Sequence, residues 1–191
     1  MPRSSEKTIS AILDAGFRLF FKRGFARVSM DDIASAAGVT KRTLYYHYTS
    51  KDALVGAVLD QQNEQSIAAF RNWTAPNTPE PALFIAGLFA QLSEWSGQPG
   101  WTGSGFTRLS MELADLPGHP VRKASQRHKS ALVLWLSDEL SSRGISAPKR
   151  IAEQIVVAME GAVVLTLIHG DPKYFSFGCN LASKALTGEL E

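Results

Sequence analysis

The sequence contains very little cysteine and lacks a long uninterrupted hydrophobic run. Its only cysteine, Cys179, cannot form an intramolecular disulfide, so we expect a reducing compartment such as the cytoplasm. No apolar stretch reaches the roughly 18 residues of a membrane-spanning helix, and the first residues lack the apolar core of a signal peptide. The sequence therefore predicts a protein that is neither secreted nor embedded in a membrane.

Proline is rare in the first part of the chain, where none occurs between Pro2 and Pro76. Because proline interrupts helices, nearly all of this stretch can be helical. Later prolines separate segments of helical length and lie at positions 99, 117, 120, 148 and 172. No segment keeps the two-residue period of a strand for long. The sequence therefore predicts an all-α protein of about nine helices.

Residues that could carry catalysis or hold a metal ion are few and scattered. No two of the four histidines have the i, i+4 spacing of a helical zinc site. The glycine-rich stretch around Ser104 fits neither the nucleophile-elbow pattern nor a phosphate-binding loop, since Thr102 stands where the elbow needs glycine. We therefore expect no enzyme activity, no metal ion and no cofactor.

The charge is unevenly distributed along the chain. Residues 1–51 hold nine Lys and Arg against four Asp and Glu, whereas the remainder holds eleven against fourteen. A basic N-terminal part joined to a slightly acidic body is typical of a DNA-binding domain followed by a domain with another task.

A stretch of 24 residues, SMDDIASAAGVTKRTLYYHYTSKD, begins at Ser29. Ser29 is expected to cap a short helix, with Asp32 completing a capping box. Gly38 is expected to end that helix, because glycine adopts left-handed backbone geometry without strain, and Thr40 to cap the next one. The second helix directs Leu44 to the core and leaves basic and aromatic side chains on its other faces. This pattern favours a DNA-reading helix-turn-helix over a solvated basic helix hairpin.

The extended stretch SMDDIASAAGVTKRTLYYHYTSKDAL resembles the DNA-binding signature of the TetR/AcrR family of bacterial transcriptional regulators. The resemblance covers about the first third of the chain, and it implies that the second helix enters the major groove of double-stranded operator DNA. Whether Arg42 reads a base or contacts a phosphate stays open at this point. The DNA-binding residues it implies are Ser29, Lys41, Arg42, Thr43, Tyr45, Tyr46, His47 and Lys51.

Two domains are expected. Residues 1–51 would form a three-helix DNA-binding domain, followed by a connecting helix over 50–73, and residues 74–191 a helical domain for effector binding and dimerisation. The proline-rich stretch Thr74–Pro81 suggests this boundary. The second domain is predicted to contain five helices, over 81–96, 105–116, 121–143, 148–168 and 173–186.

The segment Ile155–Ile168 is apolar on nearly every side, which predicts burial all round. The resemblance implies a homodimer formed by the last two helices, with Phe175, Phe177 and Leu181 available to the interface. Glu160 interrupts the segment and has two readings: a carboxylate paired with Lys or Arg, or a polar group that recognises a ligand.

Large apolar side chains recur in the second domain, and together with a few polar groups they could line a pocket for an aromatic or lipid-like molecule or simply form the core. The candidate pocket residues are Phe84, Phe89, Trp95, Trp101, Phe106, Arg108, Met111, Trp135, Met159 and Glu160.

These observations predict a cytoplasmic one-component regulator, more often a repressor than an activator. It would bind palindromic operator DNA as a homodimer and leave it when a small hydrophobic or aromatic effector binds. The alternative is a DNA-binding dimer without an effector, controlled by its abundance or by a protein partner.

Overall fold

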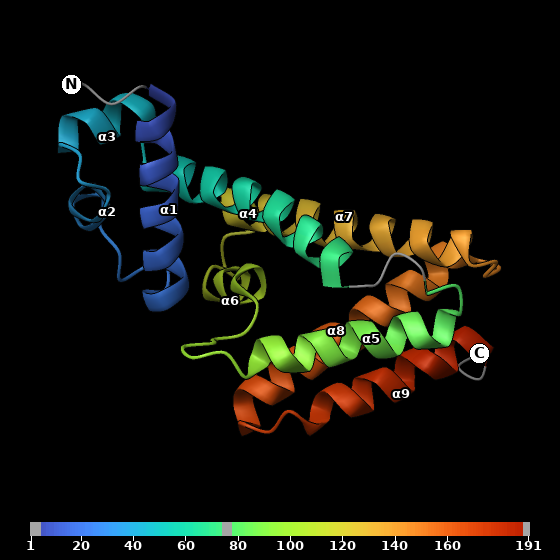
Figure 1. The fold of residues 1–191 in the computed structure, drawn as a ribbon. Helices are drawn as coiled ribbons and strands as arrows, with labels where there is room; N and C mark the ends of the chain where they lie inside the picture. Colours follow the sequence, from blue (N-terminus) through green and yellow to red (C-terminus); the bar gives the residue numbers. More distant parts are fainter. Residues whose placement is uncertain (1–4, 74–77, 189–191) are drawn as a thin grey trace. The chain divides into compact units, whose positions relative to one another are not determined.

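The computed structural model describes residues 5–73 and 78–188, and within these ranges all regular secondary structure is helical (Figure 1). Residues 74–77 of the predicted boundary lie outside the described residues. The helices are α1 (Ser5–Arg23), α2 (Met30–Ala37), α3 (Lys41–His47), α4 (Lys51–Trp73), α5 (Pro81–Ser96), α6 (Gly105–Glu112), α7 (Pro120–Ser142), α8 (Pro148–His169) and α9 (Lys173–Thr187). The predicted fold class, all-α with about nine helices, is confirmed for the described ranges.

The chain divides into two compact units. The first contains α1–α3, the first part of α4, α6 and the start of α7, over residues up to 64 and 105–128. The second contains the end of α4, α5, most of α7, α8 and α9. Both α4 and α7 therefore contribute residues to each unit.

These units differ from the division suggested by sequence, which assigned residues 105–128 to the second domain. The reason lies in α6 and the turn after it, where Phe106, Leu109 and Leu113 are buried in one apolar cluster with the side chains of α1, α2 and α4. The helix is also shorter than expected, because it ends at Glu112 instead of continuing to residue 116.

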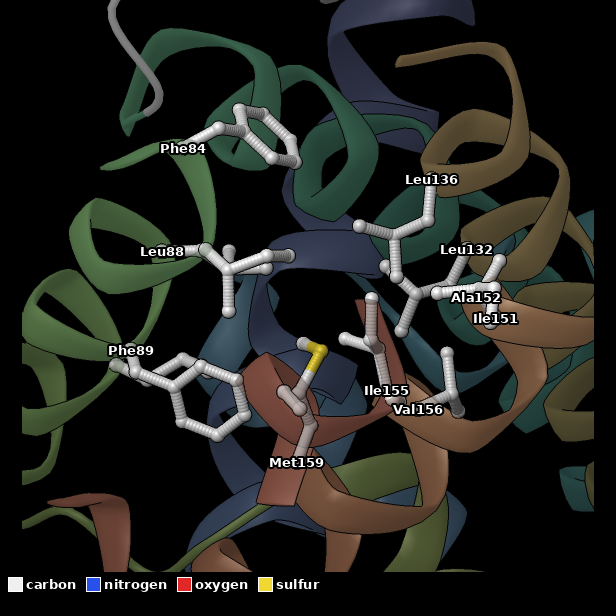
Figure 2. Close-up of a cluster of buried hydrophobic side chains, with 14 of the residues drawn as sticks. Phe84, Leu88, Phe89, Leu132, Leu136, Ile151, Ala152, Ile155, Val156 and Met159 are labelled. Carbon is white, nitrogen blue, oxygen red and sulfur yellow. The ribbon is translucent and has the colours of Figure 1, made fainter. Parts of the chain in front are cut away.

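The core of the second unit is built mainly by α5, α7, α8 and α9. Helix α9 packs against α8 and α5. Figure 2 shows part of the cluster that they form, with Phe84, Leu88, Phe89 and Met159 among its labelled side chains. Burial of so many large apolar side chains is the main favourable contribution to the stability of this unit.

Helix α8 is the one described helix that is long and apolar enough to cross a membrane by length and composition alone. Half of its most apolar window is buried inside the structure. Core helices of soluble proteins have the same property, so α8 by itself is weak evidence for a membrane span.

Candidate nucleic-acid interface

Helix α2 begins with the capping box predicted from sequence. The Ser29 backbone N–H donates to Asp32 Oδ2 over 2.9 Å, and the Asp32 N–H donates to Ser29 Oγ over 3.1 Å. Hydrogen bonds from the side chain and backbone of Ser29 lower the pKa of the Asp32 carboxyl below its usual value. The Ser29 hydroxyl also donates to Asp32 over 2.6 Å, so this side chain is committed to the cap.

The turn between α2 and α3 depends on Gly38. Its φ of 64° and ψ of 37° are left-handed, and its N–H points to the carbonyls of Ala34 and Ser35. Thr40 then caps α3 by accepting the Thr43 N–H over 3.1 Å. The predicted order of cap, glycine turn and second cap is confirmed, and it fixes the direction in which α3 leaves α2.

Helix α3 has one buried residue, Leu44, which anchors it to the apolar core of the first unit. Four of its other six side chains are exposed. Tyr46 is 84% exposed and its ring meets His47 edge to face, with centroids 5.1 Å apart. The exposed residues of α3 are Lys41, Arg42, Tyr45 and Tyr46. A short helix with one anchor and this exposed composition has the form of a DNA-recognition helix.

Lys41 has a partner within the chain. Its Nζ lies 2.9 Å from Asp31 Oδ1, and Asp31 raises the pKa of the Lys41 ammonium. Both side chains are well exposed, and exposed ion pairs contribute little to stability. Lys41 can therefore exchange this carboxylate for a DNA group at small cost.

Lys51 makes several contacts with the turn between α1 and α2. Its Nζ donates to the carbonyls of Phe25 and Val28, each over 3.0 Å, and lies 4.1 Å from the centroid of the Phe25 ring. Sequence reasoning had no means of finding these contacts, because they join residues 23 and 26 positions apart. Lys51 holds the turn between α1 and α2, a role that was not expected.

Glu112, at the end of α6, binds the same turn from its N–H side. The carboxylate accepts the Phe25 N–H and the Ala26 N–H, each over 2.8 Å. This role of Glu112 was not predicted from the sequence, because the residue lies 87 and 86 positions from Phe25 and Ala26 and leaves no local signal.

The predicted pocket residues are divided between the two units. Seven lie in the second unit, where Phe84, Phe89, Trp135 and Met159 are buried in the core. Trp95 and Trp101 pack against that core with their rings edge to face. Glu160 is partly buried and forms an ion pair with Lys129, which agrees with the interpretation of Glu160 as a carboxylate paired with Lys or Arg.

The other three predicted pocket residues belong to α6 and lie in the first unit. Phe106 is buried and stacks on His128, with centroids 3.8 Å apart. Arg108 donates to the Phe21 carbonyl over 3.0 Å. Met111 is 61% exposed. These three residues therefore belong to a different compact unit from the other seven.

No group of three or more His, Cys, Asp or Glu side chains in the described part of the chain is arranged to hold a metal ion. The single thiol, Cys179, is partly buried, and burial raises its pKa. A thiol in this state is a poor nucleophile and metal ligand.

The caps, the glycine turn and the exposed face of α3 define a helix-turn-helix DNA-binding unit. In comparison with known proteins, residues 12–58 match the family model described as bacterial regulatory proteins, tetR family. This part of the chain is therefore similar to the TetR family, as the sequence resemblance indicated, and the curated relatives that match it carry the names of transcriptional regulators.

One curated relative is the HTH-type transcriptional regulator TtgR of Pseudomonas putida, 43% identical over 60 residues, which is 31% of this chain and 29% of TtgR. The match thus spans less than a third of that relative. Solved structures match over nearly the whole length. A tetR-type regulator of Streptomyces avermitilis (sav143) has a TM-score of 0.79 and 24% identity, covering 93% of this chain and 97% of that one. The multidrug binding protein EbrR, complexed with imidazole, has a TM-score of 0.73 and 21% identity, with 97% of each chain covered. At these identities, the structures support the fold alone.

Proposed function

We propose that this protein is a one-component transcriptional repressor that binds palindromic operator DNA through α3. The observation that carries the proposal is the composition of the exposed face of α3, which presents Lys41, Arg42, Tyr45 and Tyr46 on a helix held by Leu44. Base edges in the major groove are read by such hydrogen-bonding side chains, while cations supply affinity for phosphates.

The regulator acts in this proposal as a cytoplasmic homodimer joined through α8 and α9. Both helices expose large apolar side chains, which we call the exposed apolar stripe: Val157, Leu165 and Ile168 of α8, and Phe177 and Leu181 of α9. Along α8 these positions recur at helical spacing, and exposed apolar surface of this kind is a mark of an interface. Phe175, which the sequence also offered to the interface, is only 2% exposed and belongs to the core.

A small hydrophobic or aromatic effector would release the DNA. Support comes from the second unit, which gathers seven of the predicted pocket residues, and from one of its indoles. Trp135 is 4% exposed, and its Nε1–H has no hydrogen-bond partner among the described residues. A buried donor without a partner is costly, and a ligand oxygen could satisfy it. The EbrR structure, named as a multidrug binding protein, has a similar fold.

A dimer that binds DNA without an effector is the alternative. The unpartnered Trp135 indole supports the effector-controlled form, and the titration described in the Discussion decides between the two.

The experiment that tests the DNA-binding function is selection of bound sequences from random DNA, followed by the same selection with Arg42→Ala. The wild-type protein should enrich a palindrome. Loss of a bidentate base contact costs about 1–3 kcal/mol, so Arg42→Ala should relax the preference at one position of each half-site.

Arg150→Ala, which removes the same charge from the exposed start of α8, is the matched control and should keep the full preference. If the wild type enriched no sequence, the proposed function would be refuted. If Arg42→Ala weakened selected and random DNA equally, Arg42 would contact phosphate instead of a base.

A further inference from the structure

The turn between α1 and α2, residues 24–28, is held by opposite charges on its two sides. The Glu112 carboxylate accepts its N–H groups at Phe25 and Ala26, and the Lys51 ammonium donates to its carbonyls at Phe25 and Val28. Hydrogen bonds in which one partner is charged are about twice as strong as neutral ones. Four of them meet on a turn of five residues, directly before the Ser29 cap of α2.

The contact between Glu112 and the turn depends on residues both in the turn and on α6. Gly24 has a φ of 84°, and a Cβ there would lie 2.8 Å from Glu112 Oε2, so the absence of a side chain admits the carboxylate. On α6, Gly105 and Arg108 precede Glu112 by seven and four residues and share its helix face. A Cβ on Gly105 would lie 1.9 Å from the Phe21 ring, and Arg108 donates to the Phe21 carbonyl. One face of α6 is thus fitted to the end of α1 and the turn after it.

The Phe25 ring adds an apolar link to the same turn. It stacks on Phe20, with centroids 5.9 Å apart, meets the His119 ring edge to face, and receives the Lys51 ammonium on its face. The turn is therefore fixed through its backbone and its side chain at once.

We propose that Glu112 is a positioning residue for DNA binding. By fixing the turn it sets where α2 begins, and through the Gly38 turn it sets the orientation of α3. A chain without this contact would spend part of its time with α2 and α3 misplaced, and the apparent affinity for DNA falls in proportion to the fraction of competent molecules. The inference rests on the DNA-binding function proposed above.

The sign of the effect separates positioning from simple electrostatics. Removing a negative charge from the DNA-binding unit should strengthen DNA binding if only long-range attraction matters. Removing the positioning contact should weaken it. Asp115 provides the matched control, because it is an exposed acid three residues further along the chain.

The test compares Glu112→Gln, Glu112→Asp and Asp115→Asn by fluorescence anisotropy with the selected operator. Glutamine keeps the size of the side chain but offers one acceptor oxygen where two are used, and aspartate keeps the charge but is one methylene shorter. Both Glu112 variants should lose about tenfold in operator affinity, which corresponds to a competent fraction of about one tenth. Asp115→Asn should bind as tightly as wild type or slightly more tightly.

Amide hydrogen exchange gives a readout that does not depend on DNA. The Phe25 and Ala26 amides should exchange faster in both Glu112 variants, while amides in the middle of α5 and α8 keep their protection. If either Glu112 variant bound operator as tightly as wild type, the positioning role would be excluded. Wild-type protein that bound no DNA would refute the proposed function instead, and the exchange data would still report on the turn.

Discussion

Gly38 shows how strongly one residue can constrain the DNA-binding unit. Its left-handed conformation costs about 1–2 kcal/mol for other L-residues, and a β-branched side chain is particularly unfavourable there. Gly38→Val should therefore abolish operator binding in an anisotropy assay, while the circular dichroism of the second unit's helices persists. The turn, and not the overall fold, would be lost.

Gly87→Val is the matched control for this substitution. Gly87 lies in α5, and a Cβ there would meet no heavy atom within 4 Å. It should reduce stability only through the lower helix propensity of valine and leave DNA binding intact. Equal loss of binding in both variants would show that the turn geometry is not what matters.

Lys51 shows which features of a single residue can be predicted from the sequence and which cannot. The motif correctly placed Lys51 at the start of a helix, because caps and turns are encoded by neighbouring residues. Its bonds to Phe25 and Val28 depend on how α1 and α4 pack, which local pattern does not reveal. The predicted DNA contact of Lys51 remains a prediction, and a Lys51 substitution would also loosen the turn.

Helix α8 carries the proposed dimer contact, and Gly161 lies within its exposed apolar stripe. A Cβ on Gly161 would meet no heavy atom of its own chain within 4 Å. Gly161→Leu should therefore leave the folded chain undisturbed, yet its side chain would keep a partner helix at a distance. We expect sedimentation velocity to show monomers at micromolar concentration where the wild type shows dimers.

The same substitution at Gly87, which is equally open, serves as the control and should leave the dimer intact. A Gly161→Leu protein that sedimented with the wild type would move the interface away from this stripe.

At the scale of helices, the sequence predicted type and order well, because caps, glycines and prolines mark the ends of these elements. Helix α6 is the exception, because the sequence did not reveal to which compact unit it belongs. Its apolar residues Phe106 and Leu109 look the same whether they join one core or the other, since periodicity reports that a face is buried but not what buries it. The predicted pocket residues of α6 therefore lie in the first unit, although the sequence pattern alone grouped them with the second.

For the whole molecule, the effector proposal requires reciprocal coupling. Any factor by which an effector lowers operator affinity must equal the factor by which operator lowers effector affinity. We expect an aromatic compound that quenches the tryptophans of the second unit, Trp95, Trp101 and Trp135, to titrate at higher concentration when saturating operator is present.

Random DNA at the same concentration controls for non-specific effects on fluorescence. Identical titration curves with and without operator would disconnect the compound from regulation and favour the effector-independent dimer.

The exposed apolar stripe on α8 and α9 has a genetic consequence. If this face forms the proposed dimer, a mutant chain that has lost its DNA contacts but keeps the face would still pair with an intact chain, and a mixed dimer could read only half of a palindrome. In a cell that carries both alleles, loss of function in the first unit would then be dominant, because most dimers would contain a defective subunit. Mutations that damage the stripe would be recessive. Such chains could not pair with intact chains, so the intact chains would form functional dimers with one another.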